Sequence, residues 1–424
     1  MSFDRLVFGE CAKLVRASTN PHDNPNAPYV GLEHIGQGSL HLVGHGYARD
    51  VDSQKTKFEP SDILFGKLRP YFRKLIIAPF SGMCSTDIWV IRPRGKGNID
   101  RNFLFYWMAS EAFVSHATET SEGTRMPRAK WDVVSKLEIP YFSPSEQKAI
   151  GTLLRSLDDR IDHNRALASN LEAIARRLFK SWFIDFDPVR AKAAGEMPSG
   201  LADDIAALFP DRFVDSELVE IPEGWRVETL ASVARLNPEA WTTRKHPDEI
   251  HYLDLSNVKD GLIEAPTKYS WEEAPSRARR VLQQGDTIIG TVRPGNRSFA
   301  LIDQAGLTGS TGFAVLRPAS DMEREYLYLA STNDDATERL AHLADGAAYP
   351  AVRPEVVLAT EVIIPSDEVM AAFSDVTKGM IDRASVCKQE ANALAGIRDL
   401  LIPRLISGKL RVGDAESTIE EAIA

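Results

Sequence analysis

The residues best suited to chemistry are cations and aromatic side chains in two short segments of the first third of the chain. They are Lys67, Arg69, Tyr71, Arg73, Lys74, Arg125, Arg128 and Lys130. Arginine can bond a guanine edge through two donors, while lysine and aromatic side chains position a nucleic-acid backbone. These segments favour DNA contact. The alternative is a solvated strand edge in which Arg69-Pro70 only sets a turn.

A second set of the same kind lies roughly 220 residues later, which suggests an internal repeat. It comprises Arg277, Arg279, Arg293, Arg297, Tyr349 and Arg353. The surrounding stretch 220–365 has a net charge of −7, against +3 for residues 1–140 and −10 for the whole chain. Because an average charge says nothing of one face, it neither excludes nor establishes a basic surface.

Motifs of catalysis are absent from the sequence. There is no GxxxxGK[ST] phosphate loop, no Asn-Pro-Pro-aromatic motif for gripping a flipped base, and no nuclease-like cluster of carboxylates and lysine. The cysteines Cys11, Cys84 and Cys387 are too scattered for a zinc site of cysteine pairs. We therefore expect no catalytic residue, metal or cofactor on this chain. Without a long apolar run or a leader-like start, we also expect a soluble, cytoplasmic protein with no membrane partner.

The sequence contains an internal repeat. SDILFGKLRPYFRKLIIAPF from Ser61 aligns with QGDTIIGTVRPGNRSFALID from Gln284, so that Asp62 matches Asp286 and Arg69-Pro70 matches Arg293-Pro294. CSTDIWVIRP likewise aligns with GSTGFAVLRP, and EGTRMPRAKWDVV with DGAAYPAVRPEVV. Each copy leads into a helical stretch. We therefore predict two globular units alternating with two long helices.

Short apolar runs bounded by Gly, Pro and Asp predict strands in both globular units. They are 75–77, 88–91, 287–291 and 313–316. Residues 101–117 and 323–343 have the spaced apolar residues of amphipathic helices. We therefore predict mixed α/β units with an emphasis on strands.

The first long helix has a heptad seam. Positions stepping alternately by four and three residues are Ile150, Leu154, Leu157, Ile161, Asn164, Ala168, Leu171, Ala175, Leu178 and Trp182. Ser145, which follows Pro144, is the expected helix start. The 38 residues from Glu146 to Phe183 would span roughly 57 Å.

A weaker seam marks the second long helix. It steps through Val369, Phe373, Val376, Met380, Arg383, Cys387, Glu390, Leu394, Ile397 and Leu401, and Pro403 should limit its end. Since neither helix can bury its stripe alone, a pseudo-twofold axis between the repeats would pair them as an antiparallel coiled coil. Parallel packing, or two helices docked separately, are the alternatives.

The stretch from Phe179, through which the chain leaves the first helix, is rich in aromatic residues. It contains Trp182, Phe183 and Phe186 and reaches the second globular unit at Ile221-Pro222. An ordinary linker is one interpretation. So many rings favour docking on the helices or on a partner.

Several ordered motifs together resemble one protein family. FGKLRPYFRK, EGTRMPRAKWD, IPYFSPSEQKAI, SWFIDFDPVRAK and IRDLLIPRLISGKL resemble the specificity subunit of type I restriction-modification systems, over nearly the whole chain. The resemblance implies an α+β fold with two target recognition domains, each reading half of a bipartite DNA site, and two helices that act as a ruler. The expected segments are a first recognition domain (1–142), a central helix (143–184), a connector (185–219), a second recognition domain (220–365), a C-terminal helix (366–410) and a tail (411–424).

The resemblance also implies partners. Two methyltransferase subunits that use S-adenosylmethionine would clasp the helical region, and two ATP- and magnesium-dependent restriction subunits would join them on double-stranded DNA. Thirteen of the seam residues would form the coiled-coil and subunit interface. They are Leu154, Leu157, Ile161, Asn164, Leu171, Leu178, Trp182, Phe373, Val376, Met380, Leu394, Ile397 and Leu401. The recognition domains differ where Met126-Pro127 corresponds to Tyr349-Pro350, as expected if they read different sequences. A non-catalytic protein scaffold, or an enzyme with degenerate motifs, are the competing interpretations.

Overall fold

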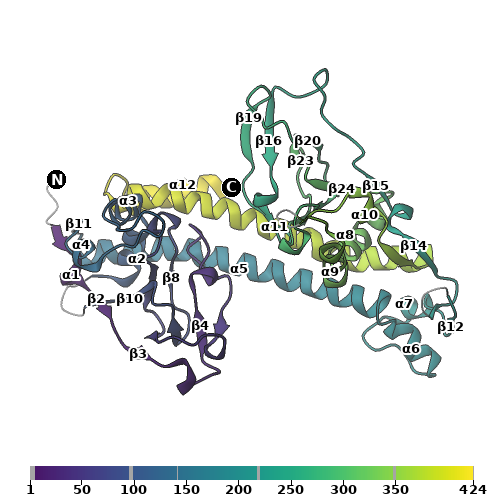
Figure 1. The fold of residues 1–424 in the computed structure, drawn as a ribbon, viewed down its shortest axis with the longest axis horizontal. Coiled ribbons are helices and arrows are strands. Elements are labelled where there is room, and N and C mark those ends of the chain that lie inside the picture. Colours follow the sequence, from purple (N-terminus) through teal and green to yellow (C-terminus); the bar gives the residue numbers. More distant parts are fainter. Residues whose placement is uncertain (1–4, 95–98, 141, 217–219, 347–349, 424) are drawn as a thin grey trace. The chain divides into compact units, whose positions relative to one another are not determined.

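A computed structural model describes residues 5–94, 99–140, 142–216, 220–346 and 350–423 (Figure 1). The chain divides into two compact units. Unit 1 consists of residues 1–163 together with 393–424, and unit 2 consists of residues 164–392. Both long helices pass through both units, so each unit contains one part of each helix.

Among its described residues before position 144, unit 1 contains three sheets and four short helices. The first sheet is the pair of β1 (Arg5–Val7) and β11 (Glu138–Pro140). The second is antiparallel and has the strand order β2 (Ala12–Val15), β10 (Ile88–Pro93), β7 (Ile63–Gly66) and β8 (Leu75–Ile77). The third has the strand order β3 (Ser18–Thr19), β6 (Lys55–Phe58), β9 (Gly82–Cys84), β4 (Pro28–Val30) and β5 (Gly46–Tyr47). The helices are α1 (Phe8–Cys11), α2 (Arg101–Ala109), α3 (Glu111–Glu119) and α4 (Trp131–Val134).

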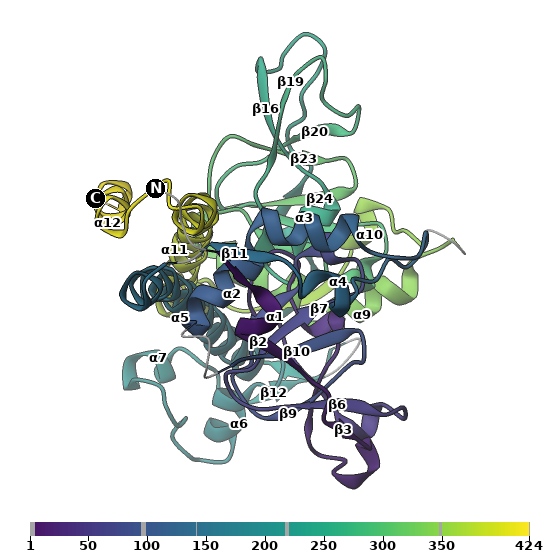
Figure 2. The same ribbon diagram turned by 90° about the vertical axis from the view of Figure 1, so that its left-hand side faces the viewer.

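Unit 2 has the same plan. One sheet is the pair of β14 (Arg226–Thr229) and β25 (Glu361–Ile364). A second, antiparallel sheet has the strand order β15 (Ala234–Leu236), β24 (Phe313–Pro318), β21 (Thr287–Gly290) and β22 (Phe299–Leu301). A third has the strand order β19 (Thr267–Ser270), β16 (Glu249–Leu253), β23 (Leu307–Ser310) and β20 (Ala278–Val281). Smaller pairs are β17 (Val258–Lys259) with β18 (Leu262–Ile263) and β12 (Phe213–Val214) with β13 (Ile221–Pro222). The helices are α6 (Asp187–Ala193), α7 (Asp203–Ala207), α8 (Arg324–Thr332), α9 (Asp334–Leu343) and α10 (Pro354–Leu358). Within this unit, the β16–β19 sheet extends away from β24 at the top of Figure 2.

The repeat predicted from the sequence is confirmed by the matching sheet orders β2-β10-β7-β8 and β15-β24-β21-β22. A buried ion pair occupies the same place in each sheet. Arg92 donates to Asp62 through Nε (2.6 Å) and Nη2 (2.8 Å), and Arg317 donates to Asp286 at 2.8 and 3.0 Å. Because Asp62 and Asp286 are almost fully buried, removing either arginine would leave a carboxylate without compensation. The predicted strands are also present.

The helices predicted at 101–117 and 323–343 are present, but neither stretch is one continuous helix. Each region forms two helices, with Ser110 between α2 and α3 and Asn333 between α8 and α9. Both residues have extended backbone, with ψ of 151° and 169°. The Asn333 carboxamide oxygen accepts the Ala336 N–H at 2.8 Å, which caps α9.

The long helices are α5 (Pro144–Phe183) and α11 (Asp367–Ile406), each of 40 residues. Ser145 is not the start of α5, because the helix already begins at Pro144. Ser143 lies before it and forms a capping box, in which Glu146 accepts from the Ser143 N–H at 2.9 Å and from its hydroxyl at 2.6 Å.

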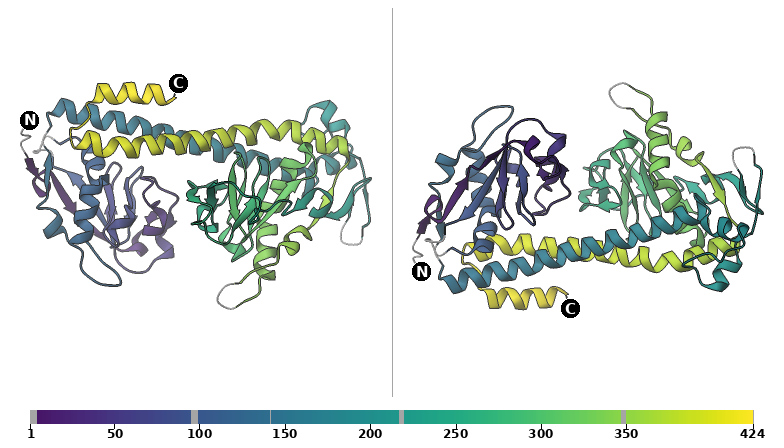
Figure 3. Two further views of the ribbon diagram at one scale, coloured as in Figure 1. Left: turned by 90° about the horizontal axis from the view of Figure 1, so that it is seen from above. Right: turned by 90° about the horizontal axis from the view of Figure 1, so that it is seen from below.

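The two long helices run antiparallel in each unit and lie side by side in both views of Figure 3. In unit 1, Arg398 of α11 bonds Asp158 of α5 at 2.6 Å. In unit 2, Lys388 of α11 bonds Glu172 of α5 at 2.7 Å. Lower numbers on one helix therefore meet higher numbers on the other, which confirms the antiparallel prediction.

The α5 seam is buried as predicted at Leu154, Leu157 and Ile161. The α11 seam is wrong at its two charged steps, because Arg383 and Glu390 are exposed while Ala384 and Ala391 are buried. A straight helix has 3.6 residues per turn, so a strict 3.5-residue step drifts from the buried face. Of the other interface predictions, Asn164, Trp182, Phe373, Leu394 and Leu401 are buried, and Leu171, Leu178, Val376, Met380 and Ile397 are partly buried.

Pro403 does not limit α11, which continues to Ile406. The helix ends where Gly408 takes a left-handed backbone, with φ of 71°, and its N–H bonds the Leu405 carbonyl at 3.1 Å. A glycine adopts this conformation without the steric cost of a side chain. The last helix, α12 (Val412–Ile423), follows.

The aromatic residues in the last turn of α5 and just after it pack into unit 2. Trp182, Phe183 and Phe186 are all buried in the core of unit 2. The rings of Trp182 and Phe183 lie 5.5 and 4.8 Å from the ring of Phe373 on α11. The ordinary-linker interpretation is therefore wrong for these residues.

Candidate nucleic-acid interface

An arginine-bearing turn follows β7 in unit 1. Arg69 and Arg73 flank a short 3-10 helix (Pro70–Phe72) and both have left-handed backbones, with φ of 51° and 47°. The Arg69 N–H bonds the Pro127 carbonyl at 2.8 Å, and its Nη2 donates to the Arg125 carbonyl at 3.3 Å. The turn thus brings together the two basic segments identified in the sequence. Left-handed non-glycine residues are strained and cluster at functional sites.

Unit 2 contains the same turn after β21. Arg293 and Arg297 flank Pro294–Asn296 with φ of 50° and 61°. The backbone N–H of the exposed Arg293 donates to the Pro350 carbonyl at 2.7 Å. The predicted contact residue Tyr349 lies outside the described residues. The repeat has therefore kept a strained geometry as well as a sequence pattern.

Beside the unit 1 turn lies a basic hollow of about 560 Å³. Arg16, Lys67 and Lys130 line it together with the indole of Trp131. Two of these cations were predicted as contacts, whereas Arg16 and Trp131 were not. Sequence could have suggested Trp131, which directly follows Lys130, but Arg16 reaches the hollow only through the fold.

Several other predicted contacts are also accessible. Tyr71 is 49% exposed, and Arg125 and Arg353 are exposed. The Arg279 guanidinium lies 4.4 Å from the Trp271 ring centroid, where it is held by a cation–π contact. Of this group, Arg125 lies on the loop that the Arg69 turn contacts.

Two cations of the turn are bonded within unit 1. Arg73 donates through Nη2 to the Gly38 carbonyl at 2.7 Å and to Asp399 of α11 at 3.1 Å. Lys74 donates to the Leu32 carbonyl at 2.5 Å, and burial lowers the pKa of its ammonium group. These contacts favour a positioning role for both side chains.

The loop cations are paired with carboxylates. Arg128 bonds Asp87 with two donors, at 2.8 and 3.1 Å, and this hydrogen bonding raises the pKa of the guanidinium. Lys130 pairs with Glu122, but both side chains are more than half exposed. An exposed pair of this kind is weak, so Lys130 can exchange Glu122 for a phosphate at little cost.

Unit 2 holds two of its predicted contacts in the same way. Arg277 bonds Tyr252 at 2.9 Å and pairs with Asp254. Arg297 bonds Asp334 at 2.8 Å. The side chains of both arginines are therefore bonded to other residues of unit 2.

A buried polar network in unit 1 was missed by the sequence analysis. Arg398, 1% exposed, donates to Asp158 at 2.6 Å and to the Ser39 carbonyl at 3.2 Å. The second Asp158 oxygen accepts the Tyr106 hydroxyl at 2.6 Å. Burial, and then the Asp158 charge, raise the pKa of Tyr106, which keeps its proton for this bond. The network joins α2, α5, α11 and a loop of the first globular region.

The corresponding positions in unit 2 are apolar. Asp158 and Arg398 are the fifteenth residue of α5 and the thirty-second of α11, and their repeat equivalents are Ile381 and Ala175. Both are buried in the unit 2 core. One end of the duplicated helix pair therefore has a charged contact where the other end has apolar packing.

Comparison with known proteins shows which proteins the chain resembles. Residues 8–173 match a family model described as the type I restriction modification DNA specificity domain. The chain is 24% identical over 458 residues to the type I restriction enzyme HindI specificity subunit of Haemophilus influenzae, covering 95% of this chain and 98% of the other. It is 22% identical to the MjaIX specificity subunit of Methanocaldococcus jannaschii, covering 75% and 71%.

The fold agrees with this resemblance. The crystal structure of the type I restriction-modification S subunit from M. genitalium matches with a TM-score of 0.58 over 96% of each chain, at 14% identity. Residues 8–173 therefore resemble a type I restriction modification DNA specificity domain, and nearly the whole chain resembles curated specificity subunits of type I restriction enzymes. In the described part of the chain, no helix is long and apolar enough to span a bilayer.

Proposed function

We propose that this chain is a DNA specificity subunit that reads a bipartite, interrupted DNA site, with each recognition domain reading one half. The observation that carries the proposal is the repetition of one fold and one strained arginine turn, at Arg69 and at Arg293. Two equivalent modules in one chain suit two half-sites separated by a gap. The division into recognition domains at 1–142 and 220–365 belongs to this proposal.

Direct DNA contact is proposed for the accessible residues. They are Lys67, Arg69, Tyr71, Arg125, Lys130, Arg279, Arg293 and Arg353. Tyr349, outside the described residues, is proposed on its sequence alone. For Arg73, Lys74, Arg128, Arg277 and Arg297 we propose that the side chains position the loops that carry these contacts. Because phosphate contacts release counterions, each lost phosphate contact should lower the salt dependence of DNA binding by about one unit of slope.

The helix pair is proposed to set the gap and to dock the methyltransferase subunits. A 40-residue helix spans roughly 60 Å, enough to separate modules that bind DNA about one helical turn of 34–36 Å apart. Deleting one heptad from each helix should shorten or abolish the recognised gap. An unchanged spacing in a methylation assay would refute the ruler.

The proposed complex contains two methyltransferase subunits and two restriction subunits on double-stranded DNA. S-adenosylmethionine would serve the first pair, and ATP and magnesium the second. This chain would carry no cofactor and would act in the cytoplasm. A scaffold that binds only proteins remains the competing function, and it predicts no salt-dependent DNA binding.

The test is co-expression with the adjacent methyltransferase gene, followed by mapping of methylated adenines. We expect one interrupted motif, whose first half changes when residues 61–130 are altered and whose second half changes when residues 284–353 are altered. Arg125→Gln and Arg404→Gln are a matched pair, since both remove an exposed arginine and only Arg125 is a proposed contact. Methylation independent of this chain, together with no DNA binding, would support the scaffold.

A further inference from the structure

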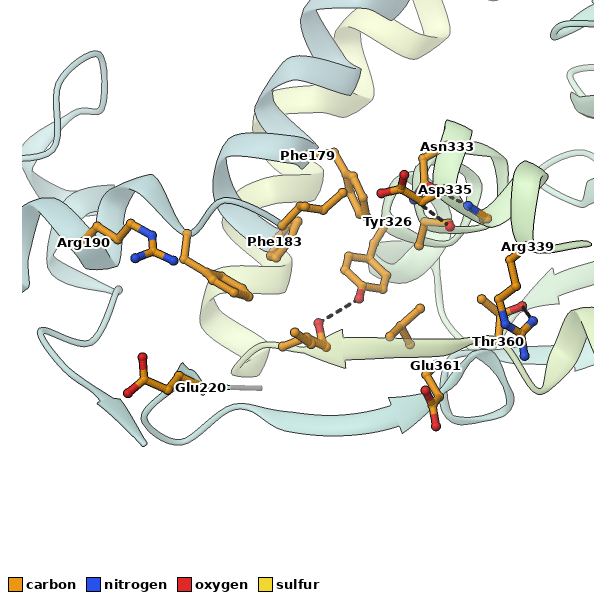
Figure 4. A pocket seen from close by; sticks show the side chains of 16 residues that line it. Phe179, Phe183, Arg190, Glu220, Tyr326, Asn333, Asp335, Arg339, Thr360 and Glu361 are labelled. Atoms are coloured by element: carbon orange, nitrogen blue, oxygen red, sulfur yellow. Dashed lines mark hydrogen bonds between the residues drawn. The ribbon is translucent and has the colours of Figure 1, made fainter. Parts of the chain in front are cut away.

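Unit 2 contains an apolar hollow of about 630 Å³ that the DNA-reading proposal does not use (Figure 4). The aromatic residues Phe179, Phe183, Phe186 and Tyr326 line it, and all four are at most 5% exposed. The Phe183 and Tyr326 rings meet edge to face at 5.1 Å, and the Tyr326 hydroxyl donates to the Ile363 carbonyl at 2.8 Å. The rings are therefore fixed in place, and the volume is in the usual range for a ligand pocket.

The repeat shows why unit 2 is hollow here. Counting from the equivalent helix breaks at Ser110 and Asn333, Ala330 occupies the position of Trp107, and Ala336 occupies that of Phe113. Both alanines line the hollow. Unit 2 therefore has two methyl groups where unit 1 has an indole and a phenyl ring.

In unit 1 these two rings fill the equivalent space. The ring centroid of Trp107 lies 5.1 Å from that of Phe8 and 4.9 Å from that of Phe113, and the Phe113 and Phe8 centroids are 5.7 Å apart. All three residues are at most 4% exposed. The comparison of the two repeats thus indicates the chemistry that fits this space, namely an aromatic side chain.

The rim of the hollow carries charges of both signs. Glu220, Asp335 and Glu361 line it, are exposed, and make no ion pair with any residue that the structure describes. Arg190 and Arg339 also line it and keep their positive charge, because Arg339 donates to the Thr360 hydroxyl at 3.2 Å and Arg190 to the Asp185 carbonyl at 2.8 Å, and both acceptors are neutral. The three carboxylates outnumber the two arginines, so the rim has a small net negative charge, which favours a cationic ligand over an anionic one.

We propose that this hollow docks a segment of a partner protein that carries an aromatic side chain flanked by lysine or arginine. The aromatic ring would replace the missing indole and phenyl groups, and the flanking cations would face the three carboxylates. Such an anchor in a walled pocket is the usual centre of a protein interface. The proposal concerns unit 2 alone and does not depend on DNA reading.

The experiment uses the full chain and three capped peptides, Lys-Trp-Lys, Lys-Ala-Lys and Glu-Trp-Glu, in calorimetric titrations at low salt. The wild type should bind Lys-Trp-Lys at least roughly tenfold more tightly than either of the other peptides. Binding should weaken as salt rises, because the rim charges are exposed. Equal affinity for all three peptides, or no binding of Lys-Trp-Lys, would overturn the proposal.

Two variants test the site. Ala330→Trp should fill the hollow as Trp107 fills unit 1, keep or raise the melting temperature, and abolish Lys-Trp-Lys binding. Its matched control is Ala319→Trp, at an exposed position of the same unit that does not line the hollow, which should bind as wild type does. Unchanged binding by a folded Ala330→Trp protein would also overturn the proposal.

A second variant tests the rim without changing the shape of the hollow. The triple change Glu220→Gln, Asp335→Asn and Glu361→Gln should weaken Lys-Trp-Lys binding by roughly three- to tenfold and remove most of its salt dependence. Glu264→Gln, an exposed carboxylate elsewhere in unit 2, is the control. Mapping of methylated adenines with the same proteins tests the DNA function separately, so the two proposals can fail independently.

Discussion

The buried network of unit 1 gives the sharpest prediction. Arg398→Ala removes the cation that faces Asp158, whose carboxylate is 8% exposed and stays in the core. Breaking a buried pair from one side costs about 3–5 kcal/mol. At about 1.36 kcal/mol per factor of ten, the amides of α2 and of the first half of α5 should exchange roughly a hundred- to several-thousandfold faster.

The repeat supplies a matched rescue. Asp158→Ile with Arg398→Ala copies the Ile381 and Ala175 pair of unit 2, and Tyr106→Phe removes the hydroxyl that would lose its acceptor. Replacing a buried ion pair by apolar groups is often neutral, so this triple variant should recover most of the lost protection.

Hydrogen exchange followed by mass spectrometry measures both effects. Arg404→Ala, an exposed position on the same helix, is the control and should change the local stability by about 0.5 kcal/mol or less. If Arg398→Ala loses less than about 1 kcal/mol of protection, the reasoning about an uncompensated charge is refuted.

Three further predictions concern single residues. Asn164 donates to Glu390 across the helix pair at 3.0 Å, so Asn164→Leu should weaken the register of the helices; unaltered assembly and gap length in the methylation assay would argue against this. Hydrogen bonds from Ser143 lower the pKa of Glu146 below 4.5, so the cap stabilises α5 above that pH and its contribution disappears as the pH falls through the lowered value. Thermal melts between pH 6 and about pH 3 should therefore converge for wild type and Glu146→Gln as the pH falls, and a constant difference would contradict the assignment. Burial raises the pKa of the Cys84 thiol to about 12, so iodoacetamide at pH 8 should label Cys84 only after unfolding; rapid labelling of the native protein would show that the thiol is accessible.

Most of the architecture was predictable because it is repeated. The landmarks Asp62 and Asp286, and the turns at Arg69 and Arg293, occur in the same order in both copies, and the structure places them in equivalent sheets. The α5 seam was also predictable, since its apolar steps are regular. The α11 seam was less so, because Arg383 breaks its pattern and a 3.5-residue step could not tell which neighbour would be buried.

The missing parts depend on contacts between distant residues. Asp158 and Arg398 are 240 positions apart, and each resembles an ordinary charged residue on a helix surface. The helix break at Ser110 was hidden because the apolar pattern continues from α2 into α3. Nor could sequence distinguish Arg125, which is exposed, from Arg73, whose cation is bonded to Asp399.

The buried ion pair of Asp158 and Arg398 also bears on whether two molecules can exchange helices. A duplicated chain offers α5 a second partner, the α5 of another copy in the same antiparallel register. In that arrangement Asp158 would face Ala175 of the other molecule and would lose the cation of Arg398. Because a buried carboxylate without a partner is costly, the asymmetry of the two repeats favours a chain that closes on itself over one that links to its neighbours.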